Sequence, residues 1–214
     1  MYPSRPFSSP LASVAGWSPA AAVGSLGTAA LVRAGQVGHF QPQPTTLTPY
    51  GGVKHSIEGM IEAVQGPRGA MAPQIRFLCE HICELVSPKD YLSEILAIRY
   101  WVWAHCPYFN DPSMIEWIRD PLALVEAIQA SPVGVVRCDC DENAVLLAAL
   151  WLHAGKEVDF ITAGFVRGEP HTHVFVRCKV PGTRDSYVVC DGVAGTREPD
   201  MLGKIVSFKA YPLN

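Results

Sequence analysis

One cysteine, one histidine and one aspartate occupy positions in this chain at which they could together activate a thiol. Cys140 lies in the run RCDCDENAVLLAALWLHAG, His173 in PHTHVFVRC and Asp191 at the end of SYVVCDG. A thiolate is the nucleophilic form of cysteine, and an imidazole can accept the thiol proton and later return it. A carboxylate behind the imidazole fixes its orientation. The order Cys, His, Asp predicts amide hydrolysis or acyl transfer.

The element that positions Cys140 is predicted to be a helix. Cys140 precedes a helical apolar pattern, and Gly155 is a suitable stop. The unpaired N–H groups at a helix N-terminus would stabilise a thiolate there. The periodic residues are Ala144, Leu147, Ala148 and Trp151.

Three acidic neighbours of Cys140 would act in the opposite direction. Asp139, Asp141 and Glu142 suit the first turn of a helix, but close anions disfavour a thiolate. The sequence therefore predicts two competing influences on the thiol, and their balance depends on where the carboxylates point.

Three segments carry a resemblance to a known family. They are Cys138–Ala144, His173–Val176 and Val188–Gly192. Together they resemble the transglutaminase-like (papain-like) core found in bacterial and bacteriophage proteins. That family typically shows a Gly-Asp-Cys-Asp-Asp-Lys-Ala run opening a helix, a His-Val-aromatic-Val strand, and a strand ending in Asp-Pro.

The resemblance implies a mechanism and a fold. It implies Cys140 as the nucleophile, His173 as the base and Asp191 as the orienting acid of a cysteine peptidase, amidase or acyltransferase. It also implies N-terminal helices packed on an antiparallel sheet, with the nucleophile at the N-terminus of a buried helix. The substrate would be a peptide or protein amide.

The resemblance covers roughly residues 73 to 195 and includes segments before the cysteine that are similar to phage-type members. Cys138 replaces the usual Gly, and Gly192 replaces the usual Pro; the first change would place two thiols beside each other in the site. The phage-type likeness implies a virion protein, in the tail, assembled in the host cytoplasm.

Residues 1–50 differ in composition from residues 51–214, which we expect to form the transglutaminase-like domain. No charged residue occurs from Pro6 to Val32, and a second Pro-rich stretch runs from Gln41 to Pro49. Such a segment predicts an extended arm with no core of its own. The phage-type resemblance implies that this arm would dock on virion structural proteins. Ala12–Val32 is too weakly apolar, and too interrupted, for us to expect membrane contact.

Composition narrows the remaining possibilities. The 17 basic and 20 acidic residues give a net charge of −3, so no nucleic-acid partner is expected. The seven cysteines are odd in number and lie in apolar contexts, which favours reduced thiols and synthesis inside a cell; Cys79 and Cys83 fit a helix face in the core. If the protein acts outside a virion, we expect it in the cytoplasm.

The order of predicted elements, helices first and antiparallel strands afterwards, indicates an α+β fold. Before the Cys140 helix, we predict helices at Ser56–Val64 (Ser56 as N-cap), Pro73–Val86, Tyr91–Cys106 and Pro121–Ala130. The predicted strands are Val158–Thr162, His173–Val180, Tyr187–Asp191 and Lys204–Ala210.

Three alternatives to the Cys140–His173–Asp191 mechanism stay open. His171 could replace His173 as the base, because alternate residues of a strand share a face. Cys138, Cys140, His171 and His173 could instead bind zinc, although their spacing is poor for it, and we expect no metal or cofactor. The chain could also be a non-catalytic structural or interaction component of a phage particle with the same fold.

Overall fold

The computed structural model describes residues 52–109, 118–192 and 203–213. The described part has five helices packed on a four-stranded antiparallel sheet, which is the α+β class predicted. The arm predicted for residues 1–50 lies outside the described residues. The helices are α3 (Gly52–Gln65), α4 (Pro73–Cys83), α5 (Tyr91–His105), α6 (Pro121–Ala130) and α7 (Cys140–His153), and the strands are β1 (Val158–Gly164), β2 (His173–Lys179), β3 (Tyr187–Cys190) and β4 (Ser207–Pro212).

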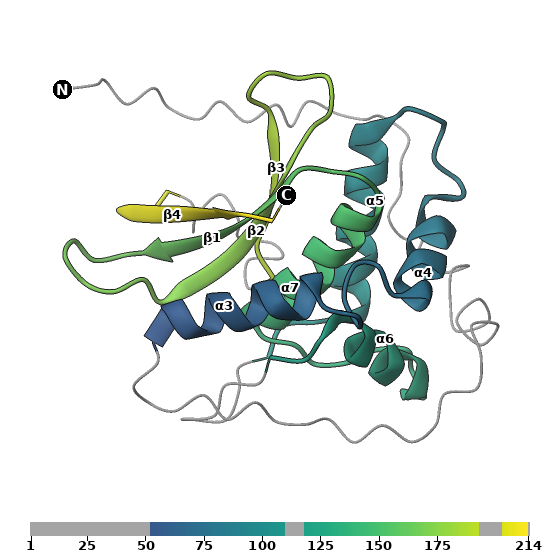
Figure 1. The fold of residues 1–214 in the computed structure, drawn as a ribbon, viewed down its shortest axis with the longest axis horizontal. Coiled ribbons are helices and arrows are strands. Elements are labelled where there is room, and N and C mark those ends of the chain that lie inside the picture. Colours follow the sequence, from purple (N-terminus) through teal and green to yellow (C-terminus); the bar gives the residue numbers. More distant parts are fainter. Residues whose placement is uncertain (1–51, 110–117, 193–202, 214) are drawn as a thin grey trace.

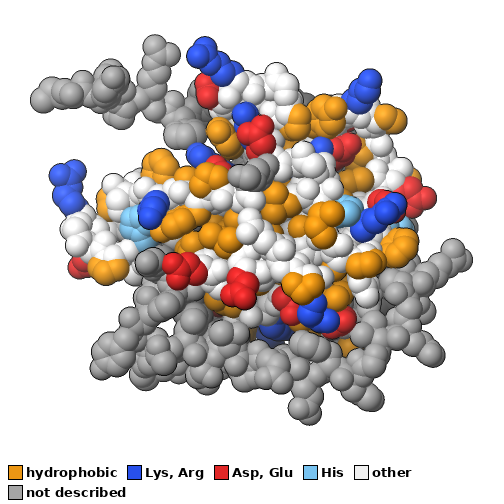
Figure 2. Space-filling view, viewed as in Figure 1, with side chains coloured by type: hydrophobic (Ala, Val, Ile, Leu, Met, Phe, Trp, Pro, Cys, Tyr) orange, Lys and Arg blue, Asp and Glu red, His pale blue; other side chains and the backbone are white. Residues whose placement is uncertain are grey.

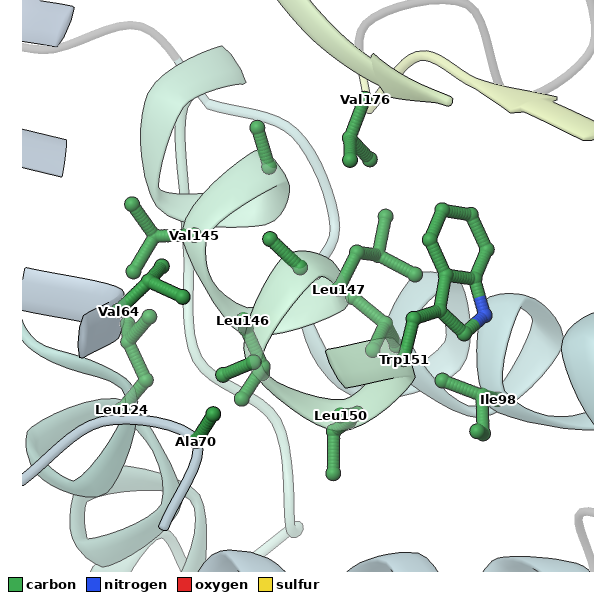
Figure 3. Close-up of a cluster of buried hydrophobic side chains, with 14 of the residues drawn as sticks. Val64, Ala70, Ile98, Leu124, Val145, Leu146, Leu147, Leu150, Trp151 and Val176 are labelled. Atoms are coloured by element: carbon green, nitrogen blue, oxygen red, sulfur yellow. The ribbon is translucent and has the colours of Figure 1, made fainter. Parts of the chain in front are cut away.

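Helix α7 is the centre of the core. Every residue from Asp141 to Trp151 is buried, as expected of a helix that is packed on all sides. Figure 3 shows Val145 on the side of Val64 and Leu147 directed toward Val176. The Trp151 indole N–H donates to the Ile95 carbonyl of α5 at 3.1 Å. Gly155 ends the helix region with a φ of 71°, in agreement with its predicted role as a stop.

The sheet has the order β3-β2-β1-β4, and the helices gather on one of its sides (Figure 1). Val174 and Val176 of β2 belong to the large core cluster that includes α7, whereas Phe175 belongs to a separate small cluster with Ile161 and Ala163 of β1. Since side chains alternate along a strand, the two faces of β2 serve different cores. The end of β2 that begins at His173 lies beside the N-terminal part of α7.

Several predicted boundaries were wrong. Helix α3 begins at Gly52, so Ser56 lies inside it and is not an N-cap. The last strand runs over Ser207–Pro212 and not Lys204–Ala210, because its pairing with β1 places Ser207 opposite Gly164 and Pro212 opposite Asp159. The other differences, in α4, α5, β1, β2 and β3, are shifts of three residues or fewer at element ends.

The described helices include none that is both long and apolar enough to cross a lipid bilayer. On the face shown in Figure 2, basic and acidic side chains are interspersed. Arg76 and Glu80, one turn apart on α4, form an exposed ion pair at 2.8 Å.

Candidate active site

Cys140 is the first residue of α7, as predicted. The Asp139 side chain caps the helix by accepting a hydrogen bond from the Glu142 N–H at 3.2 Å. The Cys140 side chain is partly buried, and its sulfur accepts a hydrogen bond from the Val174 backbone N–H. The helix start therefore carries the thiol to the edge of β2, one residue from His173.

His173 and Asp191 are in direct contact. His173 Nε2 lies 2.7 Å from Asp191 Oδ2, and their side chains are only 8% and 2% exposed. The strand register explains the contact. Val176 pairs with Cys190, so Asp191 lies opposite Phe175. His173 lies two residues before Phe175 and therefore on the same face of the sheet, within reach of Asp191. The contact predicted between the imidazole and this carboxylate is present.

The end of β3 explains why the Val174 N–H can reach Cys140. The Val180 N–H donates to Ser186, so the even-numbered residues of β2 direct their N–H groups toward β3. Strand β3 ends at Cys190, before it could pair with Val174. The sulfur of Cys140 takes the place of that missing strand partner.

The thiol of Cys140 and the ring of His173 do not hydrogen-bond to each other among the described contacts. The predicted role of His173 as the base requires such a contact, at about 3 to 4 Å. The connection is instead indirect, through the peptide between His173 and Val174. The resting site thus holds an imidazole–carboxylate pair beside a thiol that is bonded to the backbone.

His171 lies in a different environment from His173. Its Nδ1 is 2.7 Å from Thr162 Oγ1, and its Nε2 is 3.2 Å from Ser207 Oγ. Both ring nitrogens are therefore occupied by hydroxyl groups of β1 and β4. Because β2 begins only at His173, the alternation argument that would place the two histidines on one face does not extend to His171.

The electrostatic environment disfavours a resting thiolate. Burial raises the pKa of the Cys140 thiol, and the carboxylates of Asp141, Asp139 and Asp191 raise it further. The Val174 N–H acts in the other direction but is outweighed. Burial, reinforced by the acidic first turn, therefore decides the balance that the sequence left open, and it favours a neutral thiol in the resting site.

Replacing Asp139 with Asn should make Cys140 more reactive. The change removes a nearby negative charge, so the pKa of Cys140 should fall, and the thiolate fraction at any pH below that pKa should rise. Asn also caps helices well. We expect iodoacetamide to alkylate Cys140 about three- to tenfold faster at pH 8, since one pKa unit is worth tenfold in thiolate.

The rate at Cys140 is measured by peptide mass spectrometry over a pH series. Asp185→Asn, in the exposed loop between β2 and β3, is the charge-matched control and should leave the rate unchanged. An Asp139→Asn protein that reacts no faster than the wild type would show that this carboxylate does not act on the thiol.

Arg119 fastens the loop that precedes the nucleophile, a role that sequence reasoning missed. Its Nη2 donates to Glu142 Oε2 and to the Arg137 carbonyl, each at 2.8 Å, and its Nε also bonds Glu142. Burial opposes the charge, but the bonds with Glu142 outweigh it and raise the pKa of Arg119. An isolated Arg before an Asp-Pro pair carries no periodic signal that would have revealed it.

Tyr108 is a second neighbour of the site. It forms a parallel bridge with Cys138, two residues before the nucleophile, and it is 37% exposed. Burial and then the nearby Cys140 raise the pKa of its phenol. Tyr108 therefore lies within electrostatic range of the thiol.

Cys138 lies in the core. It is 1% exposed and shares a side-chain hydrogen bond with Cys106, which raises its pKa. Cys138 and Cys140, two positions apart in the sequence, thus have separate surroundings, contrary to the expectation of two thiols beside each other in the site. Among the described residues, no three His, Cys, Asp or Glu side chains are arranged to hold a metal ion, so the zinc alternative finds no support.

Two solved structures are similar to this chain. One, described as a putative protease from Parabacteroides distasonis, is 14% identical with a TM-score of 0.44, over 62% of this chain and 26% of that one. The other, described as a putative cysteine protease from Cytophaga hutchinsonii, is 15% identical with a TM-score of 0.45, over 73% and 53%. This chain therefore spans about a quarter and about half of their lengths. No family model and no curated protein matches it.

Proposed function

We propose that this protein is a thiol enzyme that acts on amide bonds, with Cys140 as nucleophile, His173 as base and Asp191 as the group that orients the base. The observation that carries the proposal is the buried contact between His173 Nε2 and Asp191 Oδ2, next to a thiol at a helix N-terminus. An imidazole held by a carboxylate beside a cysteine is the arrangement that thiol acyl transfer requires.

The contact with Asp191 supports different roles for the two ring nitrogens of His173. With Nε2–H donating to the carboxylate, Nδ1 is left to accept the proton of Cys140. Because the resting group is a neutral thiol, proton transfer to Nδ1 accompanies attack of the sulfur on the carbonyl carbon. For this step the thiol must leave the Val174 N–H, and the ring of His173, which shares the sheet face of Phe175, must move toward the α7 side. Catalytic hydrogen bonds commonly tighten in this way when substrate binds.

The rest of the cycle follows from proton and bond balance. The imidazolium returns its proton to the leaving amine as the C–N bond breaks, which leaves a thioester on Cys140. The same imidazole then takes a proton from water or from a second amine, whose attack releases the acid or the new amide. Backbone N–H groups at the start of α7 are suited to stabilise the oxyanion.

A peptide library tests the proposal. Amide-containing peptides are incubated with the protein with and without a small primary amine, and products are followed by mass spectrometry. Cleaved or amine-modified peptides should appear with the wild type and be absent with Cys140→Ser. Equal products from both proteins, or none from the wild type across the library, would contradict an enzymatic role.

A non-catalytic role as a structural or interaction component of a phage particle is the second candidate. The observations that favour it are the raised pKa of Cys140 and the lack of a hydrogen bond between Cys140 and His173 among the described contacts. Attachment to virion proteins through residues 1–50 belongs to either candidate. It rests on the composition of that segment and on the phage-type resemblance, and it stays a prediction.

A further inference from the structure

Asn143 contacts both of the segments that carry the outer members of the proposed triad. It lies in the first turns of α7, and none of its surface is exposed. One of its contacts is to Asp139, the residue before Cys140, and the other is to Gly192, the residue after Asp191. No signal in the sequence had marked either contact.

The contact on the nucleophile side is a hydrogen bond. Asn143 Nδ2 donates to the Asp139 carbonyl at 2.9 Å, and the Asn143 backbone N–H donates to the same oxygen at 3.2 Å. Since a carbonyl needs a donor, this contact also fixes which way the amide points. The peptide that leads into Cys140 is therefore held twice by one residue.

The contact on the Asp191 side is a close approach of backbone to side chain. A Cβ atom placed on Gly192 would lie 2.6 Å from Asn143 Cβ, 2.7 Å from Cγ and 2.9 Å from Nδ2. These separations are shorter than any that a real Cβ atom tolerates, and two of the three opposing atoms belong to the stiff part of the side chain. Only Gly can occupy position 192 while Asn143 keeps its place.

We propose that Asn143 and Gly192 form a positioning pair that sets the place of Asp191, and through it of His173, relative to Cys140. Because Gly192 has no Cβ, the chain after β3 can pack directly against α7. The Asn143 side chain links this contact to the peptide before the nucleophile. The consequence for catalysis rests on the function proposed above; the consequence for the His173–Asp191 contact does not.

A second feature of Asn143 agrees with this role. Its Oδ1 is buried and has no hydrogen-bond partner among the described residues. Packing alone would be served as well by an apolar side chain without a buried unpaired oxygen. The presence of an amide here, with Nδ2 hydrogen-bonded and Oδ1 not, is better explained by the bond that Nδ2 makes to the Asp139 carbonyl.

The test compares Gly192→Ala with Asn143→Gly/Gly192→Ala by two readouts. The first is the proton NMR signal of the hydrogen-bonded His173 ring N–H, assigned by its absence in His173→Ala. The second is the rate at which p-nitrophenyl acetate acylates Cys140. Gly192→Ala should lose the ring signal and slow acylation by about 10²-fold, the scale of an ångström-sized misplacement.

The double variant should recover both readouts to the level of Asn143→Gly alone, because removing the Asn143 side chain leaves room for the new Cβ but also removes the bond to Asp139. Gly59→Ala is the control, since the nearest atom to its Cβ would lie at an ordinary 3.6 Å. A folded Gly192→Ala protein that keeps the ring signal would overturn the proposal, and so would a folded double variant that recovers neither readout.

Asn143→Ala provides the same test if Gly192→Ala is too unstable to fold. It loses the bond to Asp139 and should weaken the ring signal and slow acylation while unfolding remains cooperative. An unchanged signal and rate would overturn the proposal. A wild type that shows the ring signal but never acylates Cys140 would instead contradict the proposed function and leave the positioning pair intact.

Discussion

Replacing His173 with Ala is expected to slow acylation of Cys140 by p-nitrophenyl acetate by about 10²–10⁴-fold, the usual contribution of a positioned general base. The effect should be large here because the pKa of Cys140 is raised, so little thiolate exists to react without a base. Release of p-nitrophenol at neutral pH gives the rate directly.

His171→Ala is the matched control, because this neighbouring histidine has both ring nitrogens bonded to Thr162 and Ser207. It should leave the acylation rate close to that of the wild type. A protein in which the His171 change slows acylation and the His173 change does not would make His171 the base.

Replacing Glu142 with Gln should destabilise the fold by about 2–4 kcal/mol, because it leaves the charge of Arg119 without its partner in a largely buried place. The side chains of Arg119 and Glu142 are 18% and 3% exposed. Because the same pair holds the loop before Cys140, we also expect slower acylation in the protein that remains folded.

Urea unfolding measures the stability change, and Glu80→Gln is the control. Glu80 pairs with Arg76 on the surface, where both side chains are more than half exposed, so its loss should cost no more than about 0.5 kcal/mol. Equal stability losses in the two variants would show that burial does not strengthen the Arg119–Glu142 pair.

The sequence predicted the structure correctly where residues repeat with the period of a helix or a strand, and where such a repeat also implies how two strands pair. The apolar spacing after Cys140 predicted α7, and Gly155 predicted its end. The alternation that begins at His173, together with a strand ending near Asp191, predicted two adjacent strands. Their antiparallel pairing brings His173 and Asp191 together.

The parts that could not be predicted depend on single tertiary contacts. Two examples are the hydrogen bonds of Arg119 to the loop before Cys140 and the close packing of Gly192 against Asn143. Both join segments that are far apart in the chain, and neither produces a periodic pattern in the sequence. The state of the Cys140 thiol was also undecided. It depends on how deeply the sulfur is buried and on how far three carboxylates lie from it, and residue spacing supplies neither.

The most direct test of a Cys140 nucleophile is to trap the acyl-enzyme. The protein is mixed with p-nitrophenyl acetate, quenched in acid within the first turnover, digested and mapped by mass spectrometry. We predict one acetyl group per chain, on Cys140, as a thioester that hydroxylamine removes, and none on Cys140 in the His173→Ala protein at the same time point. Acetyl groups spread over lysines and other cysteines at equal rates, with Cys140 unmodified, would contradict this function.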